Sequence, residues 1–182
     1  MVYILLATGF EEAEAIVPAD LLRRAGVEVA LVGVTGPVVT GAHGIAVTCD
    51  RELSQEKPDG LELLMLPGGL DGVKNIGESP AAVSLIREAA DDPDCYLAAI
   101  CAAPTLLGGL DLLDGFDAVC YPGLEGGLGA ANVQKGRSVV TDRDVITGEG
   151  PGAAFDFGLK LVETLKGAET AKQVAHDACW HH

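Results

Sequence analysis

Short runs of almost purely apolar residues recur along the chain, and segments with helical periodicity lie between them. Four of these runs have the length of strands that are buried on both faces: Val2–Ala7, Val27–Val34, Leu61–Leu66 and Tyr96–Ile100. Buried strands that alternate with helices form a parallel sheet that is covered on both faces. The pattern therefore predicts an α/β fold, a three-layer α/β/α sandwich around a mostly parallel sheet, with residues 1–182 forming a single domain.

The segments between these strands contain helix and hairpin signals. The first helical pattern ends at Gly26 and contains Pro18, so we expect this helix to begin near Pro18 or to bend there. Ala118–Tyr121 is a candidate fifth strand of the sheet. The remaining predicted elements are hairpins within residues 35–50 and 138–148, and helices over residues 80–90, 156–165 and 168–178.

Charge and cysteine content exclude several classes of protein. The net charge of −15 argues against a nucleic-acid partner and against an anionic membrane surface. No apolar run approaches the roughly 20 residues of a membrane span, and the first residues lack the basic start of a signal peptide, so we expect a cytoplasmic protein. The five cysteines are scattered and form no CxxC pair, which favours reduced thiols and predicts no metal site.

Cys101 directly follows the strand Tyr96–Ile100 and precedes a segment that can open a helix. A nucleophile on a sharp strand-to-helix turn needs small residues two positions before and after it, and Ala99 and Ala103 meet this need. Because a helix start carries partial positive charge, we expect the pKa of this thiol to lie below its usual value of about 8.5. The alternative is a buried, inert cysteine, which is the commonest fate of a free thiol.

Three carboxylates, those of Glu11, Glu12 and Glu14, follow the first strand. The simplest interpretation is a solvated acidic helix start, which the helix dipole favours. One of the three could instead turn toward the neighbouring strand ends. A carboxyl group beside the Cys101 thiol would have a raised pKa and would share one proton with the thiol.

Two glycines, Gly68 and Gly69, end the strand Leu61–Leu66. They can form a simple tight turn. Alternatively, they allow close backbone approach, and the N–H groups of Gly69 and Ala102 then form an oxyanion hole. The segment Gly148–Phe155 resembles a turn and helix start rather than a phosphate loop, because it lacks the lysine and hydroxyl residues of such loops.

The combined motifs resemble those of the ThiJ/PfpI family, and in particular the subfamily of the parkinsonism-associated deglycase and bacterial YajL. The resemblance covers nearly the whole chain and rests on four ordered segments: Gly9–Gly26, Leu66–Gly69, Ala98–Leu107 and Gly150–Glu163. It implies a flavodoxin-like sandwich, similar to class I glutamine amidotransferases, that assembles as a homodimer and needs no cofactor.

The resemblance also implies roles for individual residues. The reactive cysteine falls on Cys101, its partner carboxyl on Glu14, and the oxyanion N–H groups on Gly69 and Ala102, which leaves Glu11 and Glu12 as solvated acids. Further pocket positions fall on Gly68, His43 and Tyr121, and the resemblance places His43 on an excursion that lines the partner's pocket across the dimer. Ala102 stands where the protease branch of the family has a histidine, and Tyr121 stands where the human subfamily has one.

The expected function is that of a cysteine-dependent glyoxalase, classed as a hydro-lyase, or of a protein deglycase, classed as a hydrolase. The substrates would be 2-oxoaldehydes such as methylglyoxal and glyoxal, or their early adducts with thiols and amines. The alternative is a redox-sensing, chaperone-like stress protein with little turnover, because an accessible reactive thiol oxidises selectively. A peptidase is disfavoured by the missing histidine, and a kinase by the missing phosphate loop.

Overall fold

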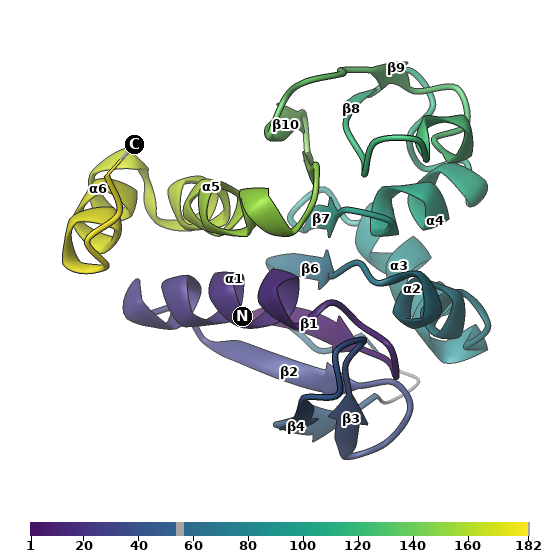
Figure 1. The fold of residues 1–182 in the computed structure, drawn as a ribbon, viewed down its shortest axis with the longest axis horizontal. Coiled ribbons are helices and arrows are strands. Elements are labelled where there is room, and N and C mark those ends of the chain that lie inside the picture. The colour runs from purple at the N-terminus through teal and green to yellow at the C-terminus, as the bar shows by residue number, and fades with distance from the viewer. Residues whose placement is uncertain (54–56, 182) are drawn as a thin grey trace.

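The computed structural model describes residues 1–53 and 57–181, and a seven-stranded sheet forms its centre (Figure 1). The strand order is β10-β11-β7-β6-β1-β2-β5, and every neighbouring pair is parallel except the edge pair β10–β11. The strands are β1 (Val2–Leu6), β2 (Val29–Gly33), β5 (Arg51–Glu52), β6 (Leu63–Leu66), β7 (Tyr96–Ile100), β10 (Val139–Asp142) and β11 (Val145–Gly148). The predicted mostly parallel sheet is confirmed.

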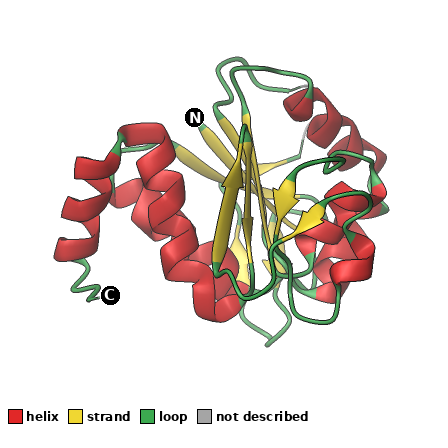
Figure 2. Ribbon diagram, turned by 90° about the horizontal axis from the view of Figure 1, so that it is seen from above, coloured by secondary structure: helices red, strands yellow, loops and turns green. Residues whose placement is uncertain are grey.

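Helices cover both faces of this sheet and complete the three layers (Figure 2). One layer holds α1 (Glu12–Arg24), α5 (Ala154–Lys166) and α6 (Ala168–Asp177), and the other holds α2 (Leu70–Gly77), α3 (Pro80–Ala90) and α4 (Ala103–Gly109). The helix α3 has the bounds that the sequence predicts, because Ser79 caps its first turn and Pro80 occupies the first helical position. The helix α2 and the short strand β5 have no counterpart in the sequence prediction.

Helix α1 begins at Glu12 and continues through Pro18, so the prediction of a start near Pro18 is wrong. A proline inside a helix removes the bond to the carbonyl four residues earlier, here that of Glu14. Tertiary packing offsets this loss, because α1 lies tightly against α5 at Gly158. A methyl group on Gly158 would stand 3.0 Å from the Cα atom of Pro18.

The prediction that Ala118–Tyr121 forms a fifth strand of the central sheet is also wrong. Only β8 (Asp117–Ala118) is extended, and it pairs with β9 (Asn132–Val133) in a separate two-stranded sheet, as β3 (Val38–Thr40) does with β4 (Ala46–Thr48). The place beside β7 belongs to β11. Tyr121 instead donates its N–H to the carbonyl of Cys101 at 2.8 Å, which draws this segment over the end of β7.

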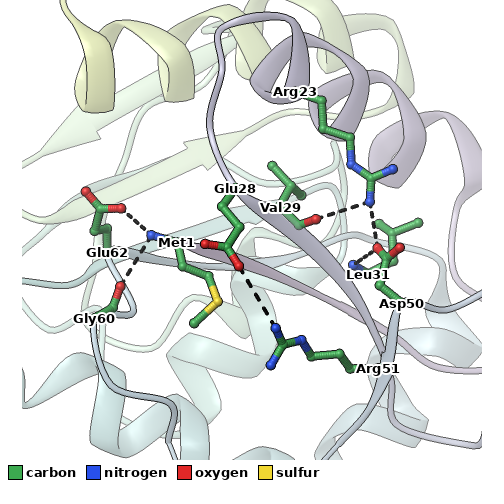
Figure 3. A network of polar contacts seen from close by, with 9 residues as sticks. All are labelled: Met1, Arg23, Glu28, Val29, Leu31, Asp50, Arg51, Gly60 and Glu62. Carbon is green, nitrogen blue, oxygen red and sulfur yellow. Dashed lines mark hydrogen bonds and ion pairs between the residues drawn. The ribbon is translucent and has the colours of Figure 1, made fainter.

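Polar contacts fasten the amino ends of the inner strands (Figure 3). The amino group of Met1 donates to the carbonyl of Gly60 and pairs with the Glu62 carboxylate. At the start of β2, Arg23 donates to the Val29 carbonyl at 3.1 Å and to the Asp50 carboxylate at 2.6 Å. These contacts anchor one edge of the sheet, and the candidate site described next lies at the opposite, carboxyl edge.

Within the described residues, no helix combines the length and apolar character that crossing a bilayer requires.

Candidate active site at Cys101

The carboxyl ends of β1, β6, β7 and β11 meet at one edge of the sheet, and Cys101 lies at the centre of this edge. Cys101 has a φ of 65°, the left-handed region that costs a non-glycine residue free energy. Its N–H donates to the Gly148 carbonyl at 2.9 Å, and its carbonyl accepts from Tyr121 at 2.8 Å. Ala99 and Ala103 are fully buried on either side. The predicted sharp strand-to-helix turn is therefore present, and the bonds to Gly148 and Tyr121 hold Cys101 in its strained conformation.

Glu14 projects from the first turns of α1 toward this thiol and has no exposed surface. Its Oε2 accepts the Gly68 N–H at 2.8 Å. Its Oε1 has no hydrogen-bond partner within the part of the chain that the structure describes. A buried carboxyl oxygen without a donor is costly, and such atoms mark sites where a proton or a ligand completes the arrangement.

Gly68 makes room for the approach of Glu14 and Cys101. A methyl group on Gly68 would stand 2.5 Å from Glu14 Oε2 and 3.0 Å from Cys101 Sγ. The carboxyl and the thiol therefore face the same small space beside the Gly68 backbone. The sequence predicts Gly68 as a pocket residue. In the structure it does not line the open cavity but makes room for Glu14 beside the thiol.

The two acids have coupled, raised pKa values. Burial raises the pKa of Glu14 to about 7, with a smaller contribution from Glu11, while the Cys101 thiol and the Gly68 N–H lower it. Burial and then the Glu14 carboxylate raise the pKa of Cys101 to about 12. The expectation of a lowered thiol pKa is therefore wrong. The seven-residue helix α4 cannot offset the burial and the neighbouring negative charge.

The consequence is a pair that passes from two protons to one near neutral pH. Below about pH 7 both groups are protonated, and above it the charge lies on Glu14 while the thiol keeps its proton. Glu14 is then a carboxylate beside a thiol and can accept the thiol proton as sulfur attacks. A general base works best when its pKa lies near the operating pH.

The N–H groups of Gly69 and Ala102 are directed at Cys101, and both lower the pKa of the thiol. Gly69 has a φ of 85°, and a methyl group there would stand 2.3 Å from the Gly9 carbonyl oxygen. Only glycine fits this position without strain. Two N–H groups around one sulfur can stabilise an oxyanion that forms on an attached carbon.

An open cavity of about 590 Å³ lies above the thiol. Among its walls are Glu11, His43, Leu70, Asp71 and Tyr121. Leu70 and Tyr121 are large side chains that remain 70% and 48% exposed, so the mouth of the cavity offers apolar surface as well as charge. The structure thus places both His43 and Tyr121 on the wall of this cavity.

Glu12 is not a solvated acid, and that expectation is wrong. Its side chain is buried, Oε1 accepts the N–H groups of His43 and Ile45 at 2.8 and 3.3 Å, and Oε2 lies 2.9 Å from His43 Nδ1. Burial raises the pKa of Glu12, but these bonds outweigh it and hold the pKa below its usual value. The same contacts raise the pKa of His43, chiefly through Glu12. Glu12 thereby fixes the loop between β3 and β4 at the cavity mouth.

The side chains of Glu11, Glu12 and His43 are also chemically able to share a metal ion. One ligand atom from each lies within 4.8 Å of the others. The hydrogen bonds within the cluster already account for this arrangement, because Glu12 uses both of its oxygens in them.

Sequence reasoning missed the contribution of the segment Gly148–Pro151. The Gly148 carbonyl holds Cys101 in its strained conformation, and Pro151 lines the cavity. The sequence predicts only a turn and helix start here, and the segment does begin the short helix η2 (Pro151–Ala153) that leads into α5. The predicted hairpin over residues 138–148 was the sequence signal for this contact, because its second strand pairs with β7 and ends at Gly148.

Fold and site together define an α/β sandwich that carries a strained cysteine paired with a buried carboxyl. The DJ-1/PfpI family model matches residues 1–164, and the chain belongs to this family. Protein dj-1beta of Drosophila melanogaster is 37% identical over 174 residues, which cover 94% of this chain and 92% of that protein. The glutathione-independent glyoxalase DJR-1.2 of Caenorhabditis elegans is 33% identical over 174 residues, which cover 93% of this chain and 90% of that protein.

Solved structures agree with this assignment. The crystal structure of Drosophila melanogaster DJ-1beta superposes with a TM-score of 0.94 at 35% identity and covers 100% of this chain and 98% of that one. The oxidized form of Toxoplasma gondii DJ-1 superposes with a TM-score of 0.93 at 31% identity, with the same coverage.

Proposed function

We propose that this protein is a cofactor-free glyoxalase or deglycase that acts on 2-oxoaldehydes or their early thiol and amine adducts, with Cys101 as nucleophile and Glu14 as its proton partner. The observation that carries the proposal is the buried Glu14 carboxyl with an unpartnered Oε1 and a pKa of about 7, beside a thiol at a strained turn. The similarity to a protein named as a glutathione-independent glyoxalase supports it.

The first step forms a bond between Cys101 Sγ and the aldehyde carbon of methylglyoxal. The thiol proton passes to Glu14 as the C–S bond forms, and protonation of the former aldehyde oxygen gives a hemithioacetal. The N–H groups of Gly69 and Ala102 stabilise the negative charge that develops on that oxygen. A thiolate formed in advance is not required, because the base already stands beside the thiol.

The next steps rearrange the hemithioacetal and release the product. Glu14 removes the proton from the carbon attached to sulfur and returns it to the adjacent carbon through an enediol, which converts the hemithioacetal into an isomeric lactoyl thioester. Water then cleaves the C–S bond, releasing lactate and restoring the thiol. The net reaction adds one water to methylglyoxal and consumes no oxidant or reductant; glyoxal gives glycolate by the same route.

The test is lactate production from methylglyoxal in the absence of glutathione. Replacing the nucleophile in Cys101→Ala should lower the rate at least about 10³-fold. Cys120→Ala is the control, because Cys120 is also a free cysteine but is buried and does not line the cavity. Equal rates in the wild type and Cys101→Ala would refute the role of Cys101.

A redox-sensing role is the second candidate, and the same geometry favours it. Cys101 is partly accessible, and its sulfur faces the N–H groups of Gly69 and Ala102, which can bind the oxygens of a sulfinate. Protonated Glu14 can donate a further hydrogen bond. Mass spectrometry after mild peroxide treatment should find Cys101 oxidised well before Cys49. Equal oxidation of the two residues would exclude this role.

We further propose that the chain forms a homodimer through the face that joins α1 to the β3–β4 hairpin. Ile16 and Ile45 are 40% and 57% exposed there and line a shallow, mainly apolar hollow together with Ala13 and Val17. A second copy of the chain would remove this surface from water. Light scattering should give twice the chain mass for the wild type and the chain mass for Ile16→Glu.

A further inference from the structure

A second hollow adjoins the cavity above Cys101. Its volume is about 480 Å³, and it shares Tyr121, Pro122 and Pro151 with that cavity. Tyr121 lines both hollows, and its ring lies close to Gly150, where a methyl group would be 3.2 Å from Tyr121 Cδ2. The two hollows therefore adjoin at Tyr121, and we call the pair the extended cleft.

The extended cleft carries unpaired negative charge. Asp71 lines the part above Cys101 and Glu149 lines the second hollow. Neither forms an ion pair with any residue that the structure describes, whereas Glu11 lies 3.6 Å from His43 Nδ1. No lysine or arginine of the described chain lines either hollow. A ligand with a positive charge near Glu149 would be attracted, and an anion would be repelled.

The second hollow also presents backbone donors. Gly150, Pro151, Gly152 and Ala153 line it, and they lead directly into the start of α5. Pro151 has no N–H, and Ala153 donates its N–H to the Gly150 carbonyl at 2.9 Å, so the N–H groups of Gly150 and Gly152 are the two without a partner in the described chain. Such groups suit the carbonyl oxygens of a peptide, because Glu149 beside them disfavours the anions that helix starts otherwise bind.

Size points to the same kind of ligand. Pockets of about 300–1,000 Å³ bury ligands far larger than a three-carbon aldehyde. The exposed apolar surfaces of Leu70 and Tyr121 serve no purpose for methylglyoxal itself, but they can cover the methylene groups of a longer chain.

We infer that the extended cleft binds a peptide whose adduct-bearing side chain enters the cavity above Cys101 while a neighbouring lysine or arginine of the same peptide lies beside Glu149. The inference rests on the proposed function, because it names the carrier of the carbonyl group that Cys101 attacks. Glu149 is then a specificity-determining residue, and Tyr121 is the wall against which the peptide packs.

The test measures binding without turnover. The probe is a fluorescent peptide with a lysine whose Nε carries a lactoyl group, a stable isomer of the first methylglyoxal adduct of lysine. One version has a free lysine next to it, and the matched version has a glutamine there. Fluorescence anisotropy at low salt should show about fivefold tighter binding of the cationic version, and the difference should shrink as salt rises.

Variants assign this preference to the second hollow. Glu149→Gln should bring the two peptides within twofold of each other, whereas Glu169→Gln, which removes the same charge from the exposed face of α6, should leave the preference intact. Tyr121→Ala should weaken both peptides together. Free Nε-lactoyl-lysine, without flanking residues, should bind more weakly than either peptide.

Several outcomes would overturn the inference. They are equal affinity for the two peptides, an unchanged preference in Glu149→Gln, and displacement of the peptide by inorganic phosphate at millimolar concentration, which would indicate an anion site. The lactate assay is separate. Peptide discrimination without methylglyoxal turnover would remove the proposed function and keep the cleft, and turnover without discrimination would remove only the cleft.

Discussion

Glu12 and Glu14 lie two residues apart on the same helix, and folding shifts their pKa values in opposite directions. Both are buried. Glu12 receives bonds from the loop between β3 and β4 and from the His43 ring, and its pKa is lowered. Glu14 receives one N–H, keeps one oxygen unpartnered and has a pKa of about 7. Burial raises the pKa of both groups; it dominates at Glu14, whereas the several donors around Glu12 together outweigh it.

The two carboxyl groups also differ in what they can do. Fully bonded Glu12 holds a loop in place and keeps its charge at every pH near neutrality. Partly bonded Glu14 stands at the border between two protonation states, and only such a group can move a proton during a reaction.

The largest expected effect on this comparison comes from Glu14→Gln. Glutamine keeps the size of Glu14 and can still accept the Gly68 N–H, but it cannot take the thiol proton. We expect methylglyoxal turnover to fall about 10²–10⁴-fold, the usual contribution of a general base. Turnover close to that of the wild type in Glu14→Gln would mean that another group moves the proton.

The second prediction concerns stability and pH. Since the pKa of Glu14 is higher in the folded chain than its ordinary value of 4.5, the folded state binds the proton more tightly than the unfolded state. Stability should therefore fall as pH rises from about 4.5 to about 7, by about 3 kcal/mol for this group. Urea unfolding at several pH values should show this fall in the wild type and its absence in Glu14→Gln.

Glu12 should behave in the opposite sense. Its pKa is lowered by folding, so its contribution is present above its unfolded value of 4.5 and is lost as pH falls through its folded value. The difference in stability between the wild type and Glu12→Gln should therefore shrink in acid. If the stability difference from the wild type changed with pH in the same direction for Glu12→Gln and Glu14→Gln, the assignment of the two carboxyl groups would be contradicted.

The third prediction tests the space between Glu14 and Cys101. Gly68→Ala places a methyl group against both side chains, at 2.5 Å from Glu14 Oε2 and 2.6 Å from Cys101 Cβ. We expect a loss of about 1–3 kcal/mol in the free energy of unfolding and a fall in turnover, because the pair must separate. The control is Gly152→Ala, where a methyl group meets no atom within 4 Å. Full activity in Gly68→Ala would show that the pair need not be in close approach.

The smallest expected effect is on His43. Glu12 is the largest cause of the raised pKa of His43, and the Glu11 charge comes second. In Glu12→Gln the pKa of His43, followed by NMR titration, should fall toward its ordinary value, and in Glu11→Gln it should fall less. An equal fall in both variants would show that long-range charge, and not the hydrogen bond, sets the acidity of His43.

The sequence predicted most of the sheet because its strands are short, apolar and buried on both faces. The strand Tyr96–Ile100 and the helix Pro80–Ala90 were predicted to the residue. The failures have local causes. Helix α1 continues through Pro18 because α5 packs against it there, and the segment after Ala118 leaves the extended conformation because Tyr121 bonds to the Cys101 carbonyl.

By itself, the sequence determined the layered sheet, the strained turn at Cys101 and the small residues around that turn, because these follow from short-range patterns. Only the tertiary structure decided how acidic each group is. Folding lowers the pKa of Glu12, because donors from a distant loop reach it, and raises the pKa of Glu14, because the assembled strands and helices bury it. The prediction of a low pKa for Cys101 is wrong because the burial and the Glu14 charge that raise this pKa arise only when the strands assemble.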